Sequence, residues 1–124
     1  MAAWPDRRAF LAGAGALAGC TPLETFNTLA RVDKGGALAE AGVAYGPDTR
    51  QVVDVYRPER PGVAPVLVYF YGGNWNSGSR RDYAFVGRTF SARGFVTVLA
   101  DYRLMPRHGF PAFVEDGAAA VRLA

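Results

Sequence analysis

The chain has 124 residues, of which 50% are hydrophobic and 20% are charged. This length suits one domain, since domains usually contain ~100–200 residues, and the composition is that of a globular rather than a disordered protein. The net charge of +3 is small, and the arginines are scattered rather than gathered into a basic stripe, so we expect no nucleic-acid partner.

Residues 1–19 differ in composition from the rest of the chain. Arg7 and Arg8 precede a short, Gly/Ala-rich apolar segment, which is too short to span a bilayer because a span needs ~20 apolar residues. This pattern resembles a twin-arginine export signal. It runs into Leu17-Ala-Gly-Cys20, which resembles the lipobox of bacterial lipoproteins. The resemblance implies cleavage before Cys20 and a lipid on its thiol.

Cys20 is the only cysteine, so an intramolecular disulfide is impossible. Lipidation accounts for a lone cysteine in an exported protein and predicts a lipoprotein anchored to a membrane on its periplasmic side. The alternatives are an uncleaved anchor, or a buried Ala/Gly helix with an ordinary Cys20 in a cytoplasmic protein.

The next part of the chain predicts a tether followed by a hairpin. Residues 20–42 are of mixed composition, and we expect a tether in which residues 22–30 form one short helix. Residues 43–45 and 51–56 are apolar, β-branched runs on either side of a Gly-Pro-Asp-Thr turn, which is typical of an antiparallel hairpin.

Residues 66–71 form a continuous β-branched, aliphatic and aromatic run that ends in Gly72-Gly73-Asn74. Such a run is typical of a strand buried on both faces in a parallel sheet. The two glycines and the asparagine tolerate positive φ, so the backbone can turn sharply and leave amide N–H groups unpaired. Ligands bind at this carboxyl edge in open α/β sheets.

A helix and a second buried strand follow. Ser79 is a candidate N-cap for a helix over residues 80–93, and Gly94 is suited to its end. Residues 95–100 predict the strand, which completes a βαβ unit. A final helix begins near Pro111. Its expected apolar face contains Phe110, Phe113, Val114, Gly117, Ala118 and Val121.

Three segments resemble landmarks of one family in the same order: Tyr69-Phe-Tyr-Gly-Gly-Asn-Trp75, Ala100-Asp-Tyr-Arg-Leu-Met-Pro106 and Phe110-Pro-Ala-Phe-Val-Glu-Asp116. The family is the α/β-hydrolase carboxylesterases, in the feruloyl-esterase and hormone-sensitive-lipase-like group, whose oxyanion loop reads His-Gly-Gly-x-Trp. The resemblance implies an α/β fold in which residues 43–124 form an incomplete, N-terminal part of the hydrolase sheet: an antiparallel hairpin leading into parallel strands with flanking helices.

The same resemblance assigns roles to the glycine loop. The backbone N–H groups of Gly73 and Asn74 match the family's oxyanion donors. Tyr71, which stands where the family has histidine, supports the loop together with Gly72 and Trp75. We expect Trp75 to pack beneath the loop, with the lining of an acyl pocket as the alternative.

The family's catalytic triad follows the chain order Ser, Asp or Glu, His, with the serine in Gly-x-Ser-x-Gly. This chain contains no such motif, so we expect no catalytic residue in it and no activity from it alone; the nucleophile, acid and histidine are expected downstream. His108, the only histidine, is interpreted as a loop residue. We expect Asp101 and Arg103 to form a local ion pair, and Glu115 and Asp116 to be structural acids.

The sequence therefore predicts the oxyanion half of a serine hydrolase that acts on small carboxylic esters. The alternatives are a formamidase-like amide hydrolase and a non-catalytic lipoprotein module that binds a ligand or partner through the exposed loop. No cluster has metal-ligand spacing and no nucleotide-binding motif is present, so we expect neither metal nor cofactor.

Overall fold

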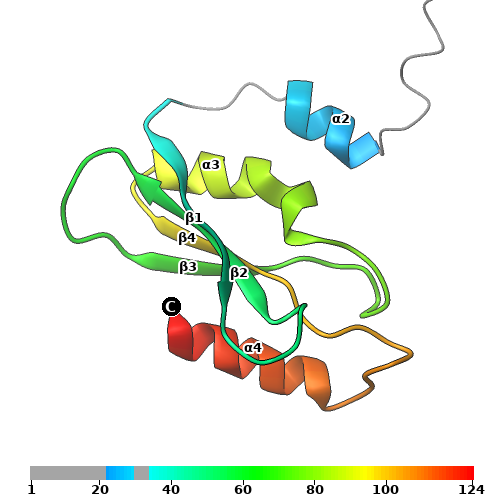
Figure 1. Ribbon diagram of the computed structural model, residues 1–124. Helices are drawn as coiled ribbons and strands as arrows, with labels where there is room; N and C mark the ends of the chain where they lie inside the picture. Colours follow the sequence, from blue (N-terminus) through cyan, green and yellow to red (C-terminus); the bar gives the residue numbers. More distant parts are fainter. Residues whose placement is uncertain (1–21, 30–33) are drawn as a thin grey trace, which may run out of the picture.

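The computed structural model describes residues 22–29 and 34–124, which form a four-stranded sheet with helices on both faces (Figure 1). The elements in chain order are α2 (Pro22–Leu29), β1 (Gly36–Ala44), β2 (Val52–Pro58), β3 (Val66–Phe70), the 3₁₀ helix η2 (Arg80–Tyr83), α3 (Ala84–Ala92), β4 (Val96–Ala100) and α4 (Ala112–Leu123).

The sheet order is β1-β2-β4-β3. Strands β1 and β2 pair antiparallel, β4 pairs antiparallel with β2, and β3 runs parallel to β4. The helix α3 connects the two parallel strands, so the predicted βαβ unit is confirmed. The expected fold class, an antiparallel hairpin that leads into parallel strands with flanking helices, is also confirmed.

The core consists of two apolar clusters, one on each face of the central strands β2 and β4. The cluster against α4 contains Val53, Val98, Ala100 and Ala120, and the cluster against α3 contains Tyr56, Val86 and Leu99. In Figure 1, α3 and α4 accordingly cover opposite faces of the sheet. Because successive side chains of a strand alternate between faces, β2 contributes Val53 to one cluster and Tyr56 to the other.

The burial expected on both faces of both inner strands is found for β4 but not for β3. Thr97 to Ala100 are buried in β4. In β3, however, Val66 is 48% exposed and Phe70 is 39% exposed. The reason is topological, because β3 lies at the edge of the described sheet whereas β4 lies between β2 and β3.

The tether predicted for residues 20–42 includes residues that belong to a strand. Strand β1 begins at Gly36, not at residue 43, and its first residue pairs with Pro58. A Cβ at Gly36 would lie 2.1 Å from Ser91 Oγ, so glycine here permits close contact with α3. Residues 1–19 and Cys20, on which the signal and lipidation predictions rest, lie outside the described residues.

Helix α4 is rotated from the orientation that its apolar pattern predicts. Its buried residues are Asp116 and Ala120, whereas Val114 and Val121 are 55% and 56% exposed. Phe110, before the helix, is 79% exposed. The ion pair that Asp116 makes with an arginine, described below, requires this side chain to face inward and turns the two valines outward. Within residues 22–29 and 34–124, no helix combines the length and the apolarity that a membrane span needs.

Candidate oxyanion loop

The segment after β3, residues 71–78, forms a strained loop at the carboxyl end of the strand. Gly73 has φ of +145°, and Asn74 and Trp75 have φ of +50° and +58°. The loop closes on itself through a hydrogen bond from Asn76 N to Gly73 O, 3.1 Å long. Positive φ in two consecutive non-glycine residues is uncommon, and such strain is concentrated at functional sites.

The amides of Gly73 and Asn74 do not take part in main-chain pairing. Among the residues that the structure describes, neither N–H group has a hydrogen-bond acceptor. Glycine is required at position 73 because a Cβ there would lie 2.3 Å from Ser77 O. The local sequence therefore fixes a bend that leaves two adjacent donors free, which is the arrangement that stabilises a developing oxyanion.

Tyr71 is the first residue of this loop, and its side chain lies directly beneath the others. The residue is 3% exposed. Its hydroxyl donates to Asp101 Oδ1 at 2.6 Å and accepts a hydrogen bond from Arg50 Nη2 at 2.6 Å. Its ring stacks between Tyr83 and Tyr102, with centroid distances of 5.4 and 5.0 Å. Burial, followed by the hydrogen bond to Asp101, raises the pKa of Tyr71 above its ordinary value.

Asp101 connects the loop to the centre of the sheet. Its carboxylate accepts hydrogen bonds from Arg80 N, at 2.8 Å, and from Arg80 Nη1. Arg80 also donates from Nε to Asp54 Oδ1 at 2.8 Å. Burial opposes the charge on Arg80, but the hydrogen bonds to the two carboxylates raise the pKa of its guanidinium. The expected local pair between Asp101 and Arg103 is wrong, because the Asp101 carboxylate turns toward η2 instead.

Arg103 pairs with Asp116 rather than with Asp101. Its Nη2 atom lies 2.7 Å from Asp116 Oδ1, and its backbone N donates to Asp116 Oδ2 at 2.8 Å. Gln51 Nε2 donates to the same carboxylate at 2.8 Å. Burial alone would raise the pKa of Asp116, but the hydrogen bonds from Arg103 and Gln51 lower it below its ordinary value. This pair fastens the loop after β4 to α4.

An apolar groove of about 280 Å³ opens beside the loop. Its lining residues are Phe70, Tyr71, Trp75, Tyr102, Phe113, Val114 and Gly117. Trp75 is 50% exposed and stacks on Phe113, with ring centroids 5.1 Å apart. Trp75 therefore lines a groove next to Gly73 and Asn74 rather than filling the space beneath the loop.

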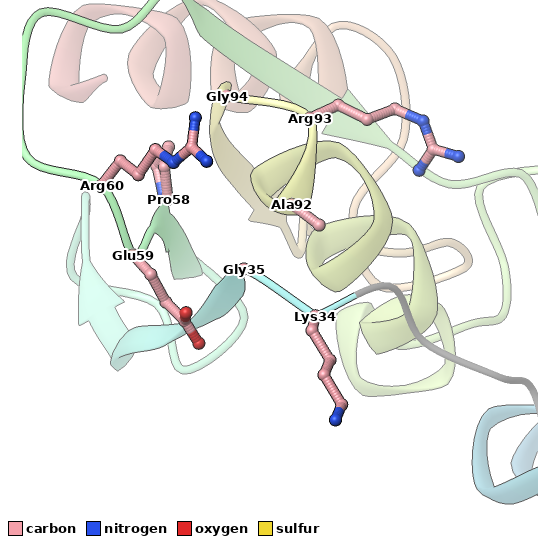
Figure 2. A pocket seen from close by; sticks show the side chains of 8 residues that line it. All are labelled: Lys34, Gly35, Pro58, Glu59, Arg60, Ala92, Arg93 and Gly94. Atoms are coloured by element: carbon pink, nitrogen blue, oxygen red, sulfur yellow. The ribbon is translucent and has the colours of Figure 1, made fainter.

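A second cavity, of about 480 Å³, lies away from the loop, near the ends of β2 and α3. Figure 2 shows Lys34, Arg60 and Arg93 around it, with their charged groups apart from one another. This arrangement does not converge on a single anion. None of the candidate oxyanion residues lines this cavity.

The serines and the histidine do not form a catalytic pair. Ser77 Oγ donates to Gly73 O at 3.3 Å, Ser79 caps η2 by accepting from Arg81 N, and Ser91 is buried in α3. His108 Nε2 lies 3.6 Å from Asp48 Oδ2. Among the described residues, no group of three or more His, Cys, Asp or Glu side chains could hold a metal ion.

Sequence reasoning overlooked Arg50, Asp54 and Arg80, which form most of the polar support under the loop. Asp54 carried a usable signal, because an acid between Val53 and Val55 in an apolar strand indicates a buried partner. Arg50 carried none, because an arginine after a turn is ordinarily solvated.

Comparisons with known proteins place this fold in one class. Esterase LipC of Mycobacterium tuberculosis is 40% identical over 85 residues, which cover 64% of this chain and 20% of LipC. A Pyrobaculum calidifontis esterase superposes with a TM-score of 0.54 at 40% identity, over 57% of this chain and 24% of that one. Esterase B of Lactobacillus rhamnosis superposes with a TM-score of 0.73 at 22% identity, over 93% of this chain and 37% of that one, which shows the shared fold.

The class is that of the α/β-hydrolase carboxylesterases in the hormone-sensitive-lipase-like group. The model of the BD-FAE family matches residues 53–123, and the chain belongs to that family. It spans about a fifth of the length of the first relatives that it matches.

Proposed function

We propose that this chain supplies the oxyanion-binding loop of a carboxylic ester hydrolase. The observation that carries the proposal is the pair of unpaired amides at Gly73 and Asn74, held in a positive-φ bend at the carboxyl end of β3. The esterases among the relatives support the same reaction class.

In the proposed reaction, the hydroxyl of a serine outside the candidate loop gives its proton to the histidine of a Ser-Asp-His triad and attacks the ester carbonyl carbon. The carbonyl electron pair moves onto oxygen, and the two amides donate to that oxyanion. The intermediate then collapses and expels the alcohol, which receives the proton that the histidine took from serine, and water hydrolyses the remaining acyl-enzyme. One such donor contributes about 10²–10³ in kcat. The groove beside Trp75 and Phe113 is suited to an apolar part of the ester.

Binding of a tetrahedral anion tests this proposal without requiring a nucleophile. Butylphosphonate carries oxygens for the amides and an alkyl chain for the groove, and its binding to the ¹⁵N-labelled chain can be followed by NMR. We expect saturable shifts of the Gly73 and Asn74 amides together with the Trp75 indole. Butanol is the control for the groove alone, and it should move only the indole. Saturable shifts confined to Lys34, Arg60 and Arg93 would contradict the proposal.

We also propose that Cys20 carries a lipid that holds the protein at a membrane. The support is the lipobox-like Leu17-Ala-Gly-Cys20 after paired arginines. Metabolic labelling with a radioactive fatty acid should mark the chain, and Cys20→Ser should abolish the label. Labelling that persists in the serine variant would exclude this site.

A further inference from the structure

Arg50 lies in the turn between β1 and β2, far from the glycine loop in sequence. The turn is fixed by its own polar contacts: Arg50 N donates to Asp48 Oδ1 at 2.8 Å, and Gln51 N donates to Asp48 O at 2.9 Å. The arginine backbone is therefore anchored, and its side chain, 31% exposed, extends toward the loop.

One guanidinium contacts both ends of the loop. Arg50 Nη2 donates to the Tyr71 hydroxyl at 2.6 Å and to Gly78 O at 3.0 Å. Its Nε donates to Tyr102 O at 2.8 Å. Tyr71 is the first residue of the loop, Gly78 is the last, and Tyr102 belongs to the segment that follows β4. The same Nη2 lies 3.7 Å from Asp101 Oδ1.

We propose that Arg50 is a positioning residue that fixes the geometry of the Gly73 and Asn74 amides. The relevance of this geometry to ester hydrolysis rests on the function proposed above, but the ordering of the loop does not. The middle of the loop is held by a different contact, from Met105 N to Trp75 O at 2.7 Å. Without Arg50, the two ends would lose the donor that they share.

The chemistry of the contacts requires arginine. The acceptors are a phenol oxygen and two carbonyl oxygens, which are reached from two different nitrogens of a planar fork. A lysine ammonium is a compact point charge on a flexible stem. It could keep an ion pair with Asp101, but it cannot reproduce donation from both Nε and Nη2. Arg50→Lys therefore separates directional hydrogen bonding from simple charge.

Backbone ¹⁵N relaxation of the full chain tests the proposal. In the wild-type chain, we expect the Gly73 and Asn74 amides to have order parameters of ~0.85. In Arg50→Ala, we expect these order parameters to fall below ~0.6. Arg50→Lys should behave like the alanine variant, and it also serves as the test if Arg50→Ala does not fold. The matched control is Arg57→Ala, because Arg57 is an exposed arginine of the same hairpin, paired with Glu40 at 3.0 Å; it should leave the loop unchanged.

Butylphosphonate binding separates this inference from the proposed function. We expect its Kd to rise at least tenfold in Arg50→Ala and Arg50→Lys, and to stay unchanged in Arg57→Ala. Loop order that is unchanged in Arg50→Ala, or restored by Arg50→Lys, overturns the role of Arg50. If the loop loses order in the Arg50 variants but the wild-type chain does not bind the phosphonate, the role of Arg50 is supported and the proposed function is contradicted.

Discussion

Arg80 Nε lies 2.8 Å from Asp54 Oδ1, and both side chains are less than a tenth exposed. The pair joins η2 to the central strand β2, and Asp101 binds the other side of the same guanidinium. Removing the guanidinium would take this counter-charge away from two buried carboxylates, of which Asp101 would keep Arg50 Nη2 at 3.7 Å.

We therefore expect Arg80→Met to lower the free energy of unfolding by roughly 3–5 kcal/mol, the usual cost of breaking a buried ion pair. Urea unfolding followed by circular dichroism measures the change. The control is Arg81→Ala, because Arg81 is the exposed neighbour of Arg80 in η2 and its loss should change stability by less than ~0.5 kcal/mol. A loss of similar size in both variants would show that Arg80 does not depend on its buried partners.

The two glycines of the loop should respond differently to alanine. Gly73 has φ of +145° and lies against Ser77 O, whereas a Cβ at Gly72 would meet no atom within 4 Å. Strain of this kind costs about 1–3 kcal/mol. Gly73→Ala should lower stability by that amount and shift the amide resonances of the loop, and Gly72→Ala should do neither. Equal tolerance at both positions would show that the bend at Gly73 is not constrained.

The Arg103–Asp116 pair predicts a pH dependence. The pKa of Asp116 is lowered in the fold from its ordinary value of 3.8, so the unfolded state binds this proton more readily. The stabilisation is fully present above about pH 4 and is lost as the pH falls through the lowered pKa. At pH 7, Asp116→Asn should lower the free energy of unfolding by about 1.5–3 kcal/mol.

This difference between Asp116→Asn and the wild-type chain should shrink as the solution is acidified below the ordinary carboxyl pKa. Equilibrium unfolding at a series of pH values measures it. The control is Glu115→Gln, whose side chain is 65% exposed at 3.6 Å from Arg103 Nη2 and should contribute at most ~1 kcal/mol. A deficit that stays constant down to pH 2 would show that the carboxylate charge is not what stabilises this contact.

The chain alone should not hydrolyse p-nitrophenyl acetate. Its three serines are Ser77, Ser79 and Ser91, and the structure places none of them in hydrogen-bond contact with His108, whose neighbour is Asp48. A chromogenic assay together with a serine-directed fluorophosphonate probe measures both turnover and labelling. Turnover that the probe abolishes would contradict the prediction and would identify a nucleophile among these serines.

Local sequence signals predicted most of the fold correctly. The apolar runs that became β3 and β4, the Ser79 cap and Gly94, with φ of +94°, are each specified by nearby residues. Burial was predicted less well, because it depends on which strands become neighbours. Nothing within residues 66–71 could show that β3 lies at an edge of the described sheet.

In the candidate site, the bend of the loop was predicted, but the polar contacts that support it were not. Composition was enough to predict a bend at Gly73 and Asn74, since few residues adopt positive φ. The partners of Asp101 and Arg103 were predicted wrongly, because proximity in sequence suggested a local pair. The observed partners, Arg80 and Asp116, become neighbours only when η2 and α4 assemble around the strand ends.

The tyrosine under the loop has a consequence for how the loop responds to acidity. A histidine, the residue usual at this place in the resembled esterases, changes charge near pH 6.5. Tyr71 begins from an ordinary pKa of 10.0 that its surroundings raise further, so its hydroxyl stays neutral throughout the physiological range. The side chain that supports the bend therefore keeps the same charge when the surrounding pH becomes mildly acidic or alkaline.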